Sequence, residues 1–138
     1  MRVRFTVPGE PVGKGRPRVV RNGGLVRTYT PEKTASYENL VKLEYERQVG
    51  RMLRDGPVYL HIMAWYGIPK SVSKRKHEAM VGGAIRPTRK PDCDNVAKVI
   101  ADALNGLAYR DDSQVVSLIV EKWFGEEPRV EVEIRELD

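Results

Sequence analysis

Residues 90–115, KPDCDNVAKVIADALNGLAYRDDSQV, constrain the fold more than any other part of the chain. Over residues 95–107 the apolar side chains recur at every third or fourth position. This spacing places them on one face of a helix. The segment therefore predicts an amphipathic helix whose apolar face packs on the core of the protein. That face consists of Val96, Val99, Ile100, Ala103, Leu104 and Leu107.

The polar side of this helix belongs to an acidic segment. Asp94, or less favourably Asp92, is the expected N-cap, because a helix start supports negative charge and its free N–H groups accept a carboxylate partner. Asn95, Lys98 and Asp102 share the side opposite the apolar face, and the Asn-Gly pair at residues 105–106 ends the helix. Five of the seven aspartates fall within 21 residues: Asp92, Asp94, Asp102, Asp111 and Asp112.

Clustered carboxylates repel one another, so either some of them keep a proton or a cation lies among them. Oxygen ligands without a Cys–His set favour a hard cation, Mg²⁺ or Mn²⁺. Asp111 and Asp112 follow the helix, so a reversal over residues 106–110 is needed to bring them to the helix start. An EF-hand loop is excluded, because Val96 and Ala97 stand where that loop needs an Asp or Asn and then a Gly.

Each acid also has a simpler interpretation. Asp94 fits an ordinary N-cap, and Asp102 fits an ion pair with Lys98 one helical turn away. The Asp111-Asp112-Ser113 stretch fits a polar turn. These alternatives stay open at the level of the residues alone, although their coincidence beside one clean amphipathic helix favours a metal site.

The remaining patterns predict an α+β domain, a small mixed β-sheet with helices packed on it. A length of 138 residues fits one such domain. Thr30 is the expected N-cap of the first helix, and Ser71 or Ser73 that of the second. Strands are expected over residues 2–7, 58–67, 114–124 and 129–136, and the last of them should have one face in water. A hairpin turn is expected at residues 22–24. Further helices are expected over residues 31–51 and 74–81.

Charge is distributed unevenly along the chain. Residues 1–90 carry 19 Lys and Arg against 7 Asp and Glu, whereas residues 91–138 carry 5 against 12. This asymmetry fits a polyanion-binding surface beside an acidic site, and equally an ordinary basic surface folded over an acidic one. The candidate phosphate-binding cations are Lys14, Arg16, Arg18, Arg27, Lys70, Lys74, Arg75 and Lys76.

The single cysteine, Cys93, excludes an internal disulfide framework and suits a reducing cytosol. Its side chain is expected to point away from the neighbouring acids into the fold. The apolar runs are shorter than a membrane span, and the first residues lack a signal-peptide pattern. A cytoplasmic protein without a membrane partner is therefore expected.

The acidic segment resembles the RusA family of Holliday junction resolvases, endodeoxyribonucleases common in bacteria and their prophages. The family signature is Asp-x-Asp-Asn, a lysine three positions later, Asp-Ala-Leu, and Asp-Asp-x-Gln. The chain has KPDCDN, Lys98, DALNG and DDSQV at matching spacing. VPGEPVGKGRPR and TYTPEKT near the N-terminus also look like family members, so the resemblance covers most of the chain as one RusA-like domain.

The resemblance implies a small α/β subunit that works as a homodimer. It also implies Mg²⁺-dependent hydrolysis of phosphodiesters in four-way DNA junctions by paired symmetric nicks. Asp92, Asp94 and Asp112 match the catalytic acids and metal ligands of the family, and Lys98 matches its functional lysine. The supporting positions are Asn95, Asp102 and Asp111.

Two classes of function therefore compete. The first is a metal-dependent, structure-specific nuclease. The second is a non-catalytic module that binds branched DNA through its basic face, with acids that only cap helices and turns. Retention of every acid of the motif favours the nuclease. An enzyme for a small anionic substrate is disfavoured, because no Gly-rich phosphate loop leads into a helix.

Overall fold

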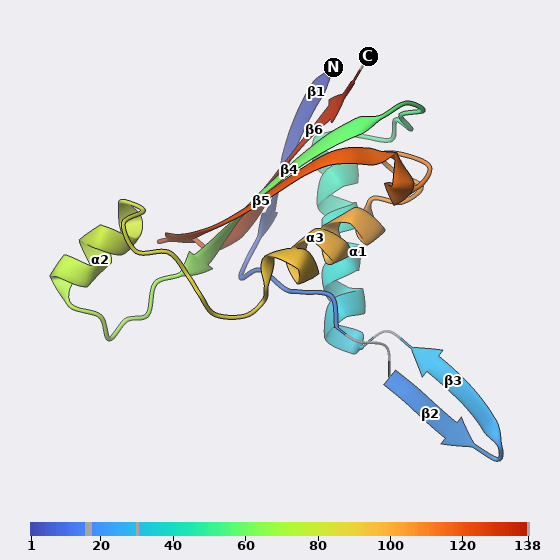
Figure 1. Cartoon of the computed structure of the whole chain (residues 1–138), viewed down its shortest axis with the longest axis horizontal. Coiled ribbons are helices and arrows are strands. Elements are labelled where there is room, and N and C mark those ends of the chain that lie inside the picture. Colours follow the sequence, from blue (N-terminus) through green and yellow to red (C-terminus); the bar gives the residue numbers. More distant parts are fainter. Residues whose placement is uncertain (16–17, 30, 138) are drawn as a thin grey trace.

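The computed structural model of the protein describes residues 1–15, 18–29 and 31–137. It is an α+β domain, as predicted, with a four-stranded mixed sheet and three α-helices (Figure 1). In chain order the elements are β1 (Arg2–Pro8), β2 (Arg18–Asn22), β3 (Leu25–Tyr29), α1 (Glu32–Gln48), β4 (Val58–Gly67), α2 (Lys74–Val81), α3 (Cys93–Ala103), the 3₁₀ turn η1 (Asp112–Gln114), β5 (Val115–Gly125) and β6 (Arg129–Glu136).

The strand order in the main sheet is β1-β6-β4-β5. β6 pairs antiparallel with both β1 and β4, whereas β5 runs parallel to β4 with Leu60 opposite Leu118. A parallel pair needs a crossover connection, and α2 and α3 lie within it. The connection that carries the acidic segment is thus the one that joins two neighbouring parallel strands.

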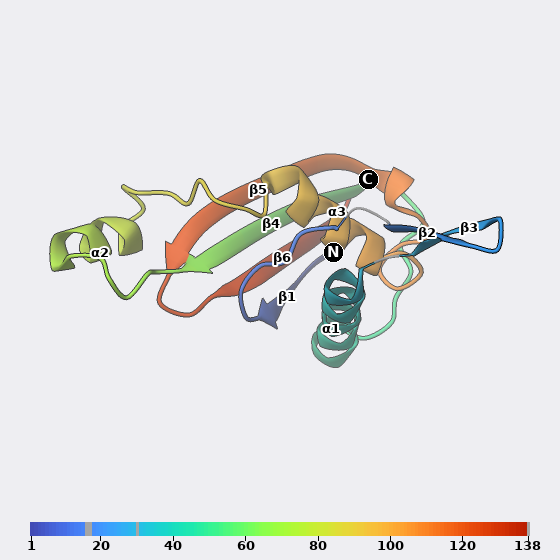
Figure 2. The same cartoon turned by 90° about the horizontal axis from the view of Figure 1, so that it is seen from below.

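Helices α1 and α3 cover the same face of the sheet and form the core with it (Figure 2). Strand β4 alternates fully buried and half-buried side chains along its whole length, as its period-two pattern predicts. On α3 the predicted apolar face is buried, and Val99 and Ile100 are completely inaccessible to solvent. This packing leaves the polar side of α3 at the surface.

Two segments project from opposite ends of the molecule (Figures 1 and 2). One is the β2–β3 hairpin, whose predicted turn lies at Gly23 and Gly24, both with positive φ angles. The other is α2, whose N-cap Ser73 accepts a hydrogen bond from the backbone N–H of Lys76. The loop after α2 is held to β5 by the Arg86 guanidinium, which lies 3.4 Å from the centre of the Trp123 ring.

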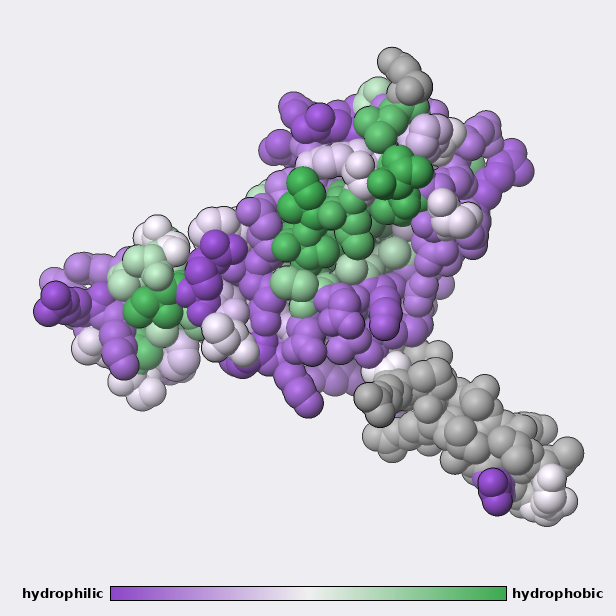
Figure 3. Space-filling model, viewed as in Figure 1, coloured by the Kyte–Doolittle hydropathy of each residue, from purple (hydrophilic) through white to green (hydrophobic). Residues whose placement is uncertain are grey.

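The outer edge of the sheet beside α3 is β5, and it is apolar and exposed (Figure 3). Val116, Leu118 and Ile119 keep 61%, 51% and 43% of their surfaces accessible. Proteins usually cover or interrupt an exposed apolar edge strand, because its free backbone groups pair readily with another chain.

Several predicted boundaries differ from the structure. Helix α1 ends at Gln48, before residue 51, because Gly50 adopts φ +92° and turns the chain away. Thr30 lies outside the described residues, and Pro31 holds the N-cap position of α1. Helix α3 begins at Cys93 and ends at Ala103, four residues before Leu107. The chain after α3 folds into buried turns, which satisfy its apolar residues without further helix.

Strand β6 departs from the predicted alternation of buried and solvent-facing side chains. Glu133, expected in water, is 3% exposed. Its carboxylate pairs with Arg4 at 3.0 Å, Arg135 at 3.4 Å and Arg2 at 3.6 Å. Burial opposes ionisation of Glu133, but the hydrogen bond from Arg4 and the three guanidinium charges outweigh it and lower the pKa of the carboxyl.

Replacing Glu133 by glutamine is expected to lower the free energy of unfolding by about 1–2 kcal/mol at neutral pH, because three arginines lose their anion. Because the pKa of Glu133 is lowered in the folded state, its ionisation stabilises the protein at pH values above the ordinary carboxyl pKa of 4.5. That stabilisation is lost as the pH falls through the folded-state pKa. Urea denaturation of both proteins should therefore differ near neutral pH and converge in acid. Glu131→Gln on the same strand is the control, and an equal loss there would contradict the prediction.

Over the residues that the structure describes, none of the helices has the length and apolar composition that crossing a membrane requires.

Candidate active site

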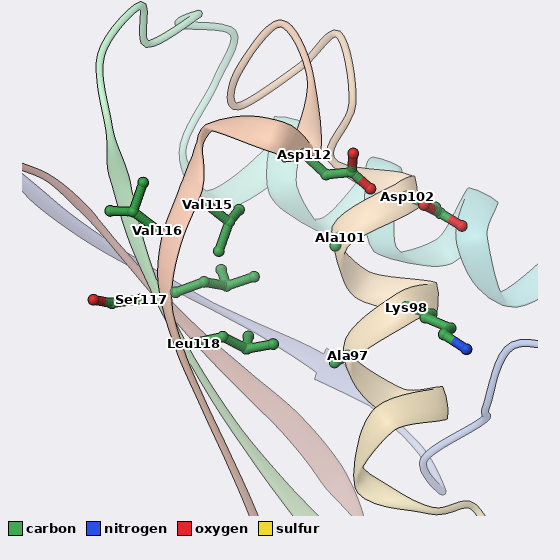
Figure 4. A pocket seen from close by; sticks show the side chains of 10 residues that line it. Ala97, Lys98, Ala101, Asp102, Asp112, Val115, Val116, Ser117 and Leu118 are labelled. Carbon is green, nitrogen blue, oxygen red and sulfur yellow. The ribbon is translucent and has the colours of Figure 1, made fainter.

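Helix α3 positions the polar residues of the acidic segment on successive turns (Figure 4). Asp94, Lys98 and Asp102 are four residues apart, so they form a line along its exposed side. Ala97 and Ala101 face β5 and keep the helix close to that strand. The burial of Val96, Val99 and Ile100 on the other side fixes the rotation of the helix about its axis.

Asp112 lies beside Asp102 near the C-terminal end of α3 (Figure 4). The two carboxyl groups lie close together. Partial burial raises the pKa of Asp112, and the negative charges of Asp111 and Asp102 raise it further. Lys98, Asp102 and Asp112 line a hollow of about 300 Å³ together with Leu60, Ala97, Ala101, Val115 and Leu118.

The turn after α3 explains why Asp112 arrives at this place. Gly106 has φ +78°, and its N–H donates to the carbonyl of Tyr109 at 2.8 Å. The Tyr109 hydroxyl donates to the carbonyl of Ala101 at 2.7 Å, which ties the turn back onto the helix. Because Leu107 and Ala108 are buried as well, the reversal is anchored in the core and Asp112 is delivered to the last turn of α3.

Asp111 has a structural role in this turn. Its side chain accepts a hydrogen bond from the N–H of Ser113 at 3.0 Å, while Gln114 accepts from the N–H of Asp111 at 3.1 Å. This reciprocal capping box holds η1. The hydrogen bonds from Ser113 lower the pKa of Asp111, so neighbouring Asp111 and Asp112 are shifted in opposite directions. The polar-turn interpretation therefore describes Asp111.

Asp92 and Asp94 lie at the other end of α3. Asp92, the less favoured choice, holds the N-cap position, although its carboxylate makes no capping hydrogen bond. Its side chain lines a second and larger groove, of about 1090 Å³, together with Asn95. Asp94, predicted as the N-cap, is an exposed residue of the first turn. The basic residues along this groove are Lys14, Lys33, Arg89 and Lys90.

The acids thus form two groups on one helix. Asp94 and Asp102 are two turns apart, about 12 Å along the axis. Over residues 1–15, 18–29 and 31–137, no three His, Cys, Asp or Glu side chains are arranged to hold a metal ion. The reversal brings Asp112 to Asp102, and within one chain it does not join Asp92 and Asp94. The neighbouring carboxylates of Asp102 and Asp112 nevertheless suit a hard cation, which would relieve their repulsion.

The predicted DNA-binding cations are found in three environments. Lys14 is 23% exposed and is ion paired with Glu38 and Asp102. Arg16 lies outside the described residues, and Arg18 and Arg27 belong to the strands of the projecting hairpin. The last group is exposed on α2 and the loop before it and consists of Lys70, Lys74, Arg75 and Lys76.

Comparison with known proteins identifies the family. The family model described as "Endodeoxyribonuclease RusA" matches residues 8–135. The chain belongs to the RusA endodeoxyribonuclease family. It is also 46% identical over 137 residues to a Bacillus subtilis (strain 168) protein named "Uncharacterized protein YqaN", an alignment that covers 98% of this chain and 96% of the relative. The resemblance of the acidic segment to RusA proteins is confirmed.

Two features of this RusA-family chain are not evident from its sequence pattern. Glu38 of α1 joins the site through Lys14, and the two glycines that flank Lys14 are the signal that could have indicated a tightly packed loop there. Cys93, expected to point into the fold, is exposed, because α3 begins at this residue and turns it outward.

Proposed function

We propose that this RusA-family protein is a metal-dependent, structure-specific endonuclease that cuts four-way DNA junctions by paired symmetric phosphodiester hydrolysis. Its biological setting would be DNA recombination and repair. The observation that carries the proposal is that Lys98, Asp102 and Asp112 line one hollow, on a helix whose other end holds Asp92 and Asp94. Junction cleavage is the activity for which the family signature in this segment is known.

By the family signature, Asp92, Asp94 and Asp112 would be the residues that hold Mg²⁺, with Mn²⁺ as a substitute, once the two ends of α3 are brought to a common site. When bound, the ion supplies a water of lowered pKa and offsets charge on the phosphate. Lys98 extends from the exposed side of α3 at the rim of the hollow, where its ammonium group can donate to a non-bridging phosphate oxygen. Asn95 and Asp102 support the acids on the same helix, and Asp111 keeps Asp112 in place by capping η1.

Paired nicks require two sites, and a C2 homodimer supplies them with matched geometry. The apolar face of α3 is buried in the core, which removes it as a dimer surface. The exposed edge of β5 remains, with Val116, Leu118 and Ile119 next to the hollow that Asp112 borders. Association of two copies along β5 would cover this edge, and it would bring additional carboxylates to acids that one chain leaves separated.

The basic segments give this enzyme a means of holding a branched substrate. The hairpin and α2 project from opposite ends of the molecule, so cations on them can contact phosphates at a distance from the acids (Figure 1). Such contacts fix position and orientation without reading bases. Lys70, Lys74, Arg75 and Lys76 are assigned this role, together with Arg16, Arg18 and Arg27.

The test is nicking of an end-labelled four-way DNA junction in Mg²⁺, compared with EDTA and with Asp94→Asn. Symmetric paired nicks are expected in Mg²⁺, with none in EDTA and a loss of about a hundredfold or more in the variant. Binding of the junction in EDTA should be unchanged or tighter in the variant, and circular dichroism should show it folded. Tight binding without cutting in both Mg²⁺ and Mn²⁺ would instead indicate a non-catalytic branched-DNA-binding module.

A further inference from the structure

The loop at residues 13–15 passes between the first turns of α1 and α3. The N–H of Lys14 donates to the carbonyl of Asn95 at 3.0 Å, and the N–H of Gly15 donates to the Thr34 hydroxyl at 2.9 Å. A Cβ at Gly13 would lie 2.7 Å from the Pro91 Cβ. A Cβ at Gly15 would lie 2.9 Å from the Thr34 hydroxyl oxygen. The loop is therefore fixed to both helices.

This placement directs the Lys14 side chain between two carboxylates. Its Nζ lies 2.6 Å from Glu38 Oε1 on α1 and 3.1 Å from Asp102 Oδ2 on α3. Burial opposes the charge on Lys14, yet hydrogen bonds and charge from Glu38 and Asp102 outweigh it, so the pKa of the amine is raised. With one ammonium group shared by two acids, little positive charge remains for a DNA phosphate.

The same Asp102 carboxyl that Lys14 contacts lies beside Asp112 at the hollow between α3 and β5. Lys14 thus connects α1 to the site through its ion pairs with Glu38 and Asp102, and Asp102 is the neighbour of Asp112. The geometry points to Lys14 as a positioning residue, which fixes the Asp102 carboxylate against Asp112 and is not a DNA ligand. This inference rests on the proposed function only for its catalytic readout.

The first experiment separates positioning from phosphate binding. Lys14→Met is expected to slow single-turnover nicking at saturating junction by about tenfold or more, because Asp102 loses its fixed orientation. The junction Kd in EDTA should stay within about twofold of wild type, with the same dependence on salt. Lys74→Met on α2 is the matched control. It should weaken binding and reduce the salt slope by about one, with the saturating rate unchanged.

Two further variants separate positioning from a general loss of stability. Glu38→Gln removes the partner on α1 and leaves the Asp102 contact, so it should lower Tm and slow nicking less than Lys14→Met does. Lys14→Arg restores a cation and should recover part of the rate lost in Lys14→Met. Equal rate losses in Glu38→Gln and Lys14→Met at matched stability would overturn the proposal. A higher junction Kd together with a reduced salt dependence in Lys14→Met would also overturn the proposal.

A readout without DNA keeps this inference distinct from the proposed function. Thermal unfolding of Lys14→Met, Asp102→Asn and the double variant forms a double-mutant cycle. If Lys14 holds Asp102, the Tm losses are coupled and the double variant loses less than the sum of the two. Additive losses would overturn the contact even in a protein that cuts junctions. Coupled losses in a protein that cuts no junction would refute the proposed function and leave the contact standing.

Discussion

Replacing Asp112 by asparagine is expected to reduce junction nicking by at least about a hundredfold while junction binding is retained. Asparagine keeps the size of the side chain but removes the charge that a divalent cation requires. Partial burial and the negative charges of Asp111 and Asp102 raise the pKa of the Asp112 carboxyl. Single-turnover nicking at saturating DNA, together with binding measured in EDTA, checks the expectation.

The same substitution should stabilise the metal-free protein at neutral pH. The pKa of Asp112 is raised in the folded state, so ionisation at neutral pH works against folding. That penalty is absent below the ordinary pKa of 3.8, where the group is protonated both folded and unfolded. Tm in EDTA should therefore rise for Asp112→Asn near neutral pH and match wild type in strong acid. An inactive variant that is less stable at neutral pH would indicate misfolding as the cause of the lost activity.

Asp111→Asn is the matched control for Asp112→Asn. An asparagine side chain can still accept the hydrogen bond from Ser113, so η1 should keep its cap. The nicking rate is then expected to fall by no more than about tenfold. Equal losses in the two variants would show that the turn as a whole, and not the Asp112 carboxylate, determines activity.

The second large effect is expected in the core. Ile100→Ala should lower the free energy of unfolding by about 2–5 kcal/mol, because a completely buried side chain of α3 is replaced by a cavity. Ile100 lies on the face of α3 that packs on the core, so the loss should also loosen the helix that carries Lys98 and Asp102. Urea denaturation followed by circular dichroism measures the change.

Leu43→Ala on α1 provides the comparison for Ile100→Ala. Leu43 is 63% exposed, so the same kind of truncation should change stability by no more than about 0.5 kcal/mol. Similar losses at both positions would contradict the burial that fixes the orientation of α3.

Local periodicity predicted most of the fold. The bounds of β4 and α2 agree with the expected residues 58–67 and 74–81, because alternation and a serine cap are readable over a few neighbouring residues. The apolar face of α3 was likewise predicted, since helical spacing alone determines which side chains share a face. The family signature identified the acidic segment independently of any structural argument.

Contacts between distant segments were not predictable in the same way. Whether the chain after α3 returns to its start or stays at its end depends on how Leu107, Ala108 and Tyr109 pack, and periodicity does not encode that choice. The sequence shows Lys14 only as one cation of a basic loop, because its two acidic partners are 24 and 88 residues away along the chain. The alternation along β6 predicts that Glu133 faces solvent, because its arginine partners on β1 become neighbours only when the sheet forms.

The crossover between β4 and β5 has a modular construction. Its first part, α2 and the following loop, packs against β5, at one end of the sheet. Its second part, α3, is packed in the core. A change in the length or charge of the first part would leave the rotation and depth of α3 as they are. If α2 holds DNA as proposed, substitutions in it would change substrate preference while the residues of α3 stay in place, so the two properties could evolve independently.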